Sequence, residues 1–294
     1  MKVLVTGGAG FIGRHVVRGL TEHGHEVVVA DRNEHGDVPT VQGDLTDPAV
    51  RARAVEGSLD AIVHLAAETS VLGSMRKPAW VHEVNVAATS GLLELARECE
   101  VGTFVMASTN AVVGAHDGTI TEDLPLRPLT PYGSTKAAAE MLLSGYAGAF
   151  ALRTPCLRLS NVYGPGMLAK DSLVPRMFRA AATGGRVQVY GDGRQRRDLV
   201  HVHDVADAFV RASESWPSGP TIVGCGTSYD VLALLDAARE ACGRPIAVEH
   251  VSAKVGEMRE VVVSPRRACD FGWRAEVDLV EGLRSTWADF DPES

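Results

Sequence analysis

The amino-acid sequence predicts an α/β fold, in which helices cover both faces of a parallel sheet, and three observations support this. Short apolar runs alternate with longer segments of helical periodicity from residue 2 to about residue 165. These runs are almost continuously apolar, as strands buried on both faces are. With 294 residues, the chain is long enough for one large domain with a smaller appended lobe.

The first 31 residues predict a strand, a glycine-rich turn, a helix and a second strand. The strands are expected at Lys2–Val5 and Val27–Ala30, and Gly24 is expected to close the helix between them. A helix that begins in such a turn points free N–H groups and a positive dipole toward an anion. The unit is therefore expected to bind the pyrophosphate of a dinucleotide, in a Rossmann-type doubly wound sheet.

Specific residues of this unit define the expected cofactor. Gly7 allows the tight turn, Gly10 lets the backbone approach a pyrophosphate, and Gly13 lets the helix pack closely on the strand. Asp31 ends the second strand, where a carboxylate accepts hydrogen bonds from the adenosine ribose and repels a 2′-phosphate. We expect NAD, not NADP, although the neighbouring Arg32 could attract a 2′-phosphate.

The alternation of strands and helices is expected to continue through the first domain. Further strands are predicted at Pro39–Leu45, Asp60–Leu65, Thr103–Ala107 and Cys156–Ser160, with helices from Pro48, Pro78 and Tyr132. Ser108 and Thr109 follow one of these strands at its carboxyl end. Open parallel sheets bind their ligands at that edge.

The alternation breaks near Gly166, where we expect a smaller, interleaved C-terminal lobe to begin. The lobe is predicted to contain Ser172–Ala182 and Leu279–Phe290 as helices, and Val187–Tyr190 and Ala247–Val251 as strands. Between them the chain is expected to return to the main sheet at Arg197–Val202, form a helix at Val205–Ser213 and add a strand at Thr221–Gly224. Residues 1–165 with about 196–229 would bind the dinucleotide, and residues 166–195 with about 230–294 the substrate.

Composition excludes several classes of protein. The net charge is −8 with no extended basic cluster, so neither nucleic acid nor an anionic membrane is an expected partner. The apolar runs are strand-length and the first strand begins at the N-terminus, so we expect a cytoplasmic protein without a signal peptide or membrane span. Five scattered cysteines predict neither disulfides nor a metal site.

Tyr132 and Lys136 carry the clearest catalytic signal. They lie four residues apart, so one helical turn places the phenol and the ammonium on the same face. A nearby cation lowers the pKa of a tyrosine from about 10 toward the range of a general base. Thr109 is expected to face the same edge and to bond Tyr132 and a substrate oxygen, although a turn-capping role would also explain it.

Taken in order, the motifs resemble those of one known family. They are Gly7-x-x-Gly10-x-x-Gly13, Asp31, Asp44-Leu45, Leu65-Ala66-Ala67, Asn85-Val86, Ser108-Thr109, Tyr132-x-x-x-Lys136, Asn161-Val162-Tyr163-Gly164-Pro165-Gly166 and Tyr190-Gly191-Asp192-Gly193 with Arg197-Asp198. This set resembles the extended short-chain dehydrogenase/reductases, and more narrowly their nucleotide-sugar epimerase/dehydratase branch, close to the UDP-galactose (UDP-glucose) 4-epimerases. The resemblance spans almost the whole chain.

The resemblance implies NAD as the cofactor, a nucleotide-diphosphate sugar (UDP-sugar favoured) as the substrate, and no metal. Tyr132 would be the base, Lys136 would hold the nicotinamide ribose and tune Tyr132, and Thr109 would complete the catalytic set. The implied cofactor contacts are Gly7, Gly10, Phe11, Ile12, Gly13, Asp31, Arg32, Asp44, Leu45, Leu65, Ala66, Ala67, Asn85, Ser108, Tyr132 and Lys136. The implied substrate contacts are Thr109, Tyr132, Asn161, Val174, Tyr190, Arg197, Lys254 and Glu257.

Departures from the family pattern narrow the expected reaction. Asn110 and Ala111 stand where related dehydratases and decarboxylases carry acids, so elimination of water is not expected. Lys254 stands where the family usually has a phosphate-binding arginine, so the identity of the nucleotide is left open. The expected reaction is epimerisation at C4 through a transient 4-keto sugar. The resemblance further implies a homodimer that pairs through the helices from Pro78 and Tyr132. Two alternatives remain: a nucleotide-sugar 4-ketoreductase, and a non-catalytic NAD-binding sensor.

Overall fold

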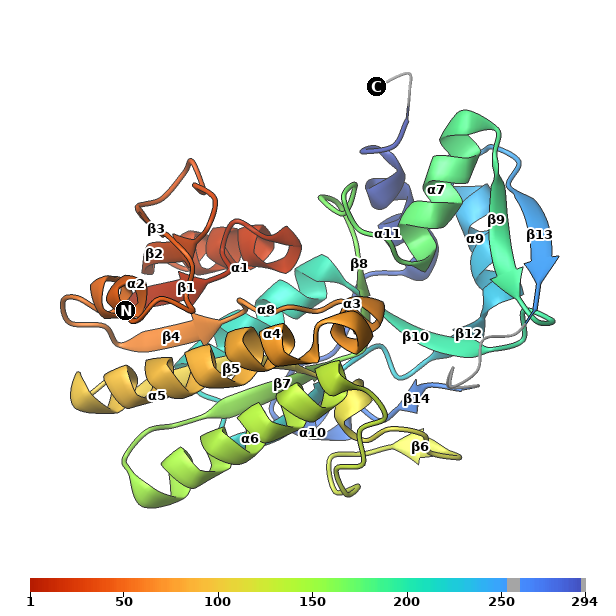
Figure 1. Cartoon of the computed structure of the whole chain (residues 1–294). Helices are drawn as coiled ribbons and strands as arrows, with labels where there is room; N and C mark the ends of the chain where they lie inside the picture. Colours follow the sequence, from red (N-terminus) through yellow and green to blue (C-terminus); the bar gives the residue numbers. More distant parts are fainter. Residues whose placement is uncertain (253–259, 292–294) are drawn as a thin grey trace. The chain divides into compact units, whose positions relative to one another are not determined.

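The computed structural model describes residues 1–252 and 260–291, which fold into two compact units (Figure 1). The first unit holds Met1–Ala115, Glu122–Leu159 and Val205–Val223. The second unit holds His116–Thr121, Ser160–Asp204 and the described residues from Gly224 onward. Residues 116–121, 160–165, 196–204 and 224–229, which were predicted to belong to the first domain, are thus part of the second unit. Which ligand each unit binds stays a prediction.

Within the described residues, seven strands of the first unit form one parallel sheet in the order β11-β7-β5-β4-β1-β2-β3. The strands are β1 (Lys2–Thr6), β2 (Glu26–Asp31), β3 (Thr40–Gln42), β4 (Ala61–His64), β5 (Thr103–Thr109), β7 (Pro155–Leu159) and β11 (Gly219–Val223). From β1 the sheet grows first toward β3 and then, in the opposite direction, toward β11. This reversal defines a doubly wound sheet, and the predicted α/β fold is confirmed.

Helices bury both faces of this sheet. The helices are α1 (Phe11–Glu22), α2 (Pro48–Ala54), α5 (Ala88–Glu98), α6 (Pro131–Ala149) and α8 (Val202–Glu214). On one face, Leu4 and Phe104 of the strands pack in one core with Leu92 of α5 and Leu143 of α6. On the other face, Gly19 allows α1 to approach α8 closely. Because both faces are covered, the strands are almost continuously apolar.

The segment that precedes α5 is more irregular than the single helix predicted from Pro78. The structure has α3 (Val71–Arg76), then α4 (Pro78–His82), and then a π-helical turn, η1 (Glu83–Ala87), that runs directly into α5. The π turn buries Asn85, which is 1% exposed. Such turns insert one extra residue into a helix and are frequent at functional sites.

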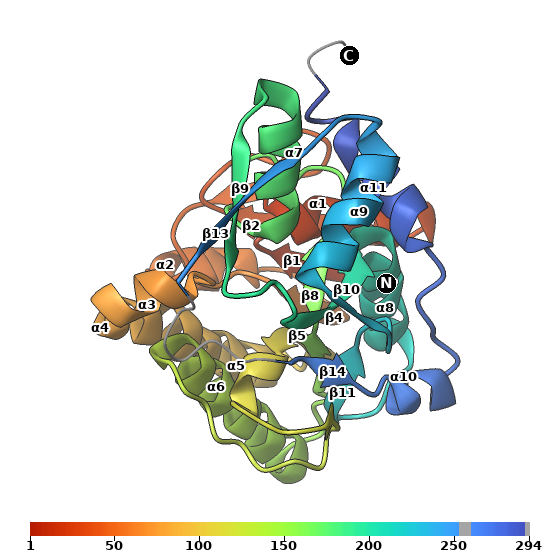
Figure 2. The ribbon, with the colours of Figure 1, turned by 90° about the vertical axis from the view of Figure 1, so that its right-hand side faces the viewer.

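The second unit contains shorter sheets and its own helices (Figure 2). Its strands are β6 (Thr119–Ile120), β8 (Asn161–Tyr163), β9 (Arg186–Tyr190), β10 (Arg196–His201), β12 (Ser228–Asp230), β13 (Ala247–Val251) and β14 (Val262–Val263). Its helices include α7 (Leu173–Thr183), α9 (Val231–Cys242), α10 (Arg266–Asp270) and α11 (Leu279–Trp287), and α9 packs against α7 and α11. Among the described residues, every helix is too short or too polar to cross a membrane.

The prediction that Arg197–Val202 returns the chain to the main sheet is wrong. This segment forms β10, which pairs in parallel with β8 and antiparallel with β12 in a separate three-stranded sheet. Asp198, fully buried, accepts hydrogen bonds from the backbone N–H groups of Cys225 and Gly226, at 3.0 and 2.7 Å. These bonds tie β10 to residues 225 and 226 of the same unit, a long-range contact that the apolar pattern of the strand alone could not show.

Candidate active site

The glycine-rich turn between β1 and α1 forms a narrow cradle. Gly7 has a φ of +72°, and a Cβ there would lie 2.7 Å from the backbone N of Ala66. A Cβ on Gly13 would overlap the carbonyl oxygen of Gly7. Gly10 is the N-cap of α1 and offers no side chain to the first N–H groups of that helix. The turn therefore fits a pyrophosphate, because no side chain blocks access of an anion to the free N–H groups and the positive end of the dipole of α1.

Asp31 is fixed beside this cradle at the end of β2. Its carboxylate accepts hydrogen bonds from the backbone N–H groups of Ala9, at 3.2 Å, and Asn33, at 3.0 Å. The oxygens of a carboxylate have further lone pairs, so these bonds leave room for ribose hydroxyls. The neighbouring Arg32 is exposed. A fixed negative charge at this point disfavours a 2′-phosphate, in agreement with the preference for NAD predicted from the sequence.

The residues expected around the adenine and along the cofactor lie at the ends of the same sheet. Asp44 accepts hydrogen bonds from the backbone N–H and the hydroxyl of Thr46, both at 2.9 Å, and Leu45 is 7% exposed. Leu65, Ala66 and Ala67 follow β4 and are partly exposed. All of these predicted contacts belong to the first unit.

Asn85 has a structural role that the sequence did not indicate. Its Oδ1 accepts from the N–H of Glu68 at 2.8 Å, and its Nδ2 donates to the carbonyl of Glu68 and to Thr135 Oγ1, at 3.0 and 3.1 Å. An amide has two N–H donors, and both are used here. Asn85 therefore ties the loop after β4 to α6 and determines the shape of that loop.

The structure brings Thr109 and Tyr132 together. Thr130 caps α6 by accepting from the N–H of Gly133 at 3.2 Å, so Tyr132 lies in the first turn of the helix. Thr109 ends β5, and its hydroxyl accepts from the N–H of Ala111 at 3.2 Å and lies close enough to the Tyr132 phenol to lower the pKa of that phenol. Lys136 lies one turn further along α6 and is 3% exposed. Both the catalytic and the turn-capping interpretation of Thr109 are thus compatible with its contacts.

Burial dominates the protonation of this group. It raises the pKa of Tyr132 to about 12, against the lowering effect of the Thr109 hydroxyl. It also lowers the pKa of Lys136 to about 8, against the buried thiol of Cys156 and the negative charge of Glu140. The expected lowering of the Tyr132 pKa is therefore not observed in the protein alone, because loss of water around the phenolate outweighs the other effects. Lys136 remains mostly protonated at neutral pH.

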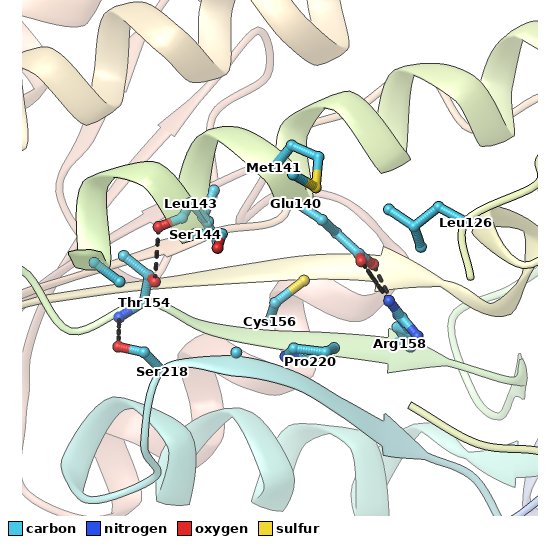
Figure 3. Close-up of a pocket in the computed structure, with 12 residues that line it drawn as sticks. Leu126, Glu140, Met141, Leu143, Ser144, Thr154, Cys156, Arg158, Ser218 and Pro220 are labelled. Atoms are coloured by element: carbon cyan, nitrogen blue, oxygen red, sulfur yellow. Dashed lines mark hydrogen bonds and ion pairs between the residues drawn. The ribbon is translucent and has the colours of Figure 1, made fainter. Parts of the chain in front are cut away.

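Behind α6, a buried ion pair that the sequence analysis missed supports the catalytic helix. Arg158 of β7 donates to Glu140 at 2.7 Å, and Ser108 donates to the same carboxylate at 2.5 Å. The side chains of Arg158 and Glu140 are only 4% and 7% exposed. Figure 3 shows this pair at the edge of a pocket of about 270 Å³ between α6, β7 and β11. None of the predicted site residues that the structure describes lines this pocket, so it is distinct from the candidate active site.

The predicted substrate contacts that the structure describes outside the catalytic group lie in the second unit. Asn161 begins β8 and donates from Nδ2 to the carbonyl of Asp198 at 2.9 Å, while Arg197 lies on the neighbouring strand β10. Val174 of α7 is 4% exposed, and Tyr190 ends β9 and is partly buried. Two further predicted contacts, at positions 254 and 257, lie outside the described residues.

Comparison with known proteins supports the same class of enzyme. The model of the NAD dependent epimerase/dehydratase family matches residues 3–226. The UDP-glucose 4-epimerase of Corynebacterium glutamicum is 33% identical over 98% of this chain and 95% of its own length. The crystal structure of Thermus thermophilus UDP-glucose 4-epimerase in complex with NAD superposes with a TM-score of 0.93 at 35% identity, covering 99% of both chains.

A further solved structure, of MoeE5 in complex with UDP-glucuronic acid and NAD, superposes with a TM-score of 0.91 at 35% identity. It covers 98% of this chain and 99% of its own. The fold and the site thus define an NAD-dependent enzyme of the extended short-chain dehydrogenase/reductase class. The chain belongs to the NAD dependent epimerase/dehydratase family, and NAD is its cofactor.

Proposed function

We propose that this protein is a UDP-sugar 4-epimerase. The observation that carries the proposal is the proximity of the Thr109 hydroxyl to the Tyr132 phenol, with the buried Lys136 one helical turn away. The relatives named above support the substrate class, because one complex contains UDP-glucuronic acid and two of these proteins are UDP-glucose 4-epimerases. Asn110 and Ala111, which follow Thr109, supply no acid for a dehydration.

In the proposed reaction Tyr132 is the base that removes the proton from the 4-hydroxyl of the sugar. Thr109 donates to or accepts from the same oxygen and keeps the phenol in line with it. The ammonium of Lys136 would hold the ribose of the cofactor and, one helical turn from Tyr132, would oppose the burial that disfavours the phenolate. When bound, NAD supplies a reversible hydride acceptor for C4 of the sugar. After the 4-keto sugar has rotated to present its opposite face, Tyr132 returns the proton to the oxygen on C4.

We further propose that the second unit holds the nucleotide diphosphate. Arg197 would bind phosphate oxygens through its guanidinium, and Asn161 on the adjacent strand would contribute its side-chain amide. Val174 and Tyr190 would contact the nucleotide, together with the residues at positions 254 and 257. Binding far from C4 keeps the sugar attached while it turns, so that both of its faces can react.

Interconversion of UDP-glucose and UDP-galactose, followed by NMR, tests the proposed function directly. A substrate deuterated at C4 should give an epimer that retains its deuterium, because a hydride held on nicotinamide does not exchange with water. UDP-glucuronic acid, assayed in parallel, tests the breadth of the sugar pocket. Stoichiometric consumption of NADH by a 4-keto sugar, without interconversion of C4 epimers, would instead identify a ketoreductase.

We also propose that the protein is a homodimer that pairs through the helical segment from Pro78 (α4, η1 and α5) and through α6, with α3 beside them. Both α3 and α4 pack against α6, and these helices expose Leu72, Met75, Trp80 and Met141, which are 40–62% accessible. Exposed large apolar side chains that gather on adjacent helices mark interaction surfaces. Light scattering should give twice the chain mass of 31.2 kDa, and Met141→Glu should shift the mass toward that of one chain.

A further inference from the structure

A buried histidine links three elements of the first unit. His64, at the end of β4, is 1% exposed and contacts Thr6 Oγ1 through Nδ1 at 2.7 Å and Thr89 Oγ1 through Nε2 at 2.9 Å. Both threonines are fully buried as well, at 0% and 1% exposure. Burial lowers the pKa of His64 to about 3, and the charge of Lys136 adds to this effect, so the imidazole is neutral at physiological pH.

The direction of each hydrogen bond in this buried series is fixed by the neighbouring bonds. Thr89 donates its single proton to the carbonyl of Asn85 at 2.8 Å, so it can only accept from His64. The neutral imidazole therefore carries its proton on Nε2, and Nδ1 accepts from Thr6. The Thr6 hydroxyl in turn accepts from the N–H of Ala66 at 3.3 Å. No member can reverse without breaking a buried bond.

The series of hydrogen bonds continues from Asn85 to the catalytic tyrosine. The side chain of Asn85 donates to Thr135 Oγ1 at 3.1 Å, and Thr135 donates to the carbonyl of Tyr132 at 2.8 Å. Asn85 and Thr135 are 1% and 7% exposed. A continuous path thus runs from the loop after β4, through His64 and the π turn, to the backbone of Tyr132.

We propose that His64 is a positioning residue for catalysis, which acts through Thr89 and Asn85 on the first turn of α6. The imidazole is a rigid bridge between two hydroxyls, and it fixes the π turn in the one register that aims the Asn85 amide at Thr135. An apolar side chain at position 64 would leave the hydroxyls of Thr6 and Thr89 buried without this partner. The proposal rests on the proposed function, because its kinetic effect is measured on C4 epimerisation.

Matched substitutions of Thr89 test the proposal without altering a residue of the catalytic group. Thr89→Val removes the hydroxyl at nearly constant volume, whereas Thr89→Ser keeps it. Leu93 is fully buried one turn further along the same helix. Leu93→Ala is therefore a control that destabilises the protein without removing any of these hydrogen bonds. We expect Thr89→Val to lower kcat about tenfold or more at unchanged KM for the UDP-sugar. Thr89→Ser and Leu93→Ala should stay within about twofold of the parent.

Two NMR measurements do not depend on turnover. In protein labelled with 15N-histidine, His64 should be neutral with its proton on Nε2 from pH 6 to 8. In protein labelled at tyrosine 13Cζ, the Tyr132 signal, assigned through Tyr132→Phe, should move in Thr89→Val and stay in place in the other two variants. If the parent shows no turnover, the proposed function fails, and these two spectra still decide the positioning role.

Specific results would overturn the inference. These are an Nδ1-protonated His64, a parental kcat or an unmoved Tyr132 signal in Thr89→Val, and equal losses of kcat in Thr89→Val and Leu93→Ala. A loss in Thr89→Ser as large as that in Thr89→Val would overturn it as well, since the serine keeps the hydroxyl.

Discussion

Replacement of Lys136 by methionine should abolish turnover and, at the same time, stabilise the fold. Lys136 is 3% exposed, and burial lowers its pKa from 10.5 to about 8. The protein therefore holds an ammonium in a place where its charge is disfavoured. Methionine has a similar length and no charge, so it fills the same space without that cost.

The size and the pH dependence of this effect follow from the change in pKa. At pH 7 the lysine is protonated in both the folded and the unfolded state. The fall in its pKa from 10.5 to about 8, at about 1.36 kcal/mol per pH unit, means that the charge destabilises the folded state by about 3 kcal/mol. Between pH 8 and 10.5 the folded protein loses this proton before the unfolded chain does, so the penalty disappears. The advantage of Lys136→Met should be largest at pH 7 and close to zero near pH 10.5.

Urea denaturation of the NAD-free protein at pH 7, 9 and 10.5 measures the difference. Lys170→Met is the matched control: Lys170 is exposed, and its replacement should change the free energy of unfolding by about 0.5 kcal/mol or less. The reasoning is refuted if Lys136→Met is less stable than the parent at pH 7, or if its advantage does not shrink above pH 8.

Three other perturbations test the same site. Tyr132→Phe should lower kcat by about 10²–10⁴-fold and leave NAD binding, measured by calorimetry, unchanged, since only the proposed base is removed. Glu140→Gln should lower the free energy of unfolding, measured by urea denaturation, by about 3–5 kcal/mol because it leaves the buried Arg158 without its charged partner. Asp171→Asn removes one partner of an exposed ion pair and should lower it by less than about 1 kcal/mol. Acidification should destabilise the protein through His64. The pKa of His64 is about 3 in the folded protein and 6.5 ordinarily, so between these values the unfolded chain binds a proton that the folded protein does not. The free energy of unfolding therefore falls as the pH drops from 6.5 to about 3, by up to about 5 kcal/mol.

Each of these expectations has an outcome that contradicts it. Near-parental turnover in a folded, NAD-loaded Tyr132→Phe protein would remove the phenol from the role of base. Equal effects of Glu140→Gln and Asp171→Asn would show that burial of the Arg158 pair has no energetic consequence. The acid destabilisation should be smaller in His64→Gln, because a glutamine at position 64 does not titrate. An unchanged pH profile in that variant would exclude His64 as the source of the destabilisation.

The parts of the structure that the sequence predicted well are those set by local patterns. The turn from Gly7 to Gly13 needs positive φ and close backbone contacts, and glycine spacing records both needs directly. The relation of Tyr132 to Lys136 depends only on the pitch of one helix. The parallel sheet followed from the alternation of elements, because parallel neighbours require crossover helices.

The parts that the sequence did not predict depend on contacts between distant segments. Arg158 lies in the apolar run Cys156–Leu159, and a charge in a buried strand requires a partner, but its partner Glu140 comes from another element. The pKa of Tyr132 rises because of burial, which only the packed structure determines. The apolar run in β10 gave no sign that the strand joins a sheet of the second unit.

The polar residues buried around α6 share one physical consequence. Glu140 binds Ser108 and Arg158, and Thr135 binds Asn85, so two side chains of the helix are tied to partners on other elements. A purely apolar interface would be at least as stable, but it would allow the helix to slide or rotate at little cost. Hydrogen bonds with fixed donors and acceptors penalise each such displacement. The arrangement therefore trades stability for one defined position of the phenol, and this is the position that proton transfer at C4 requires.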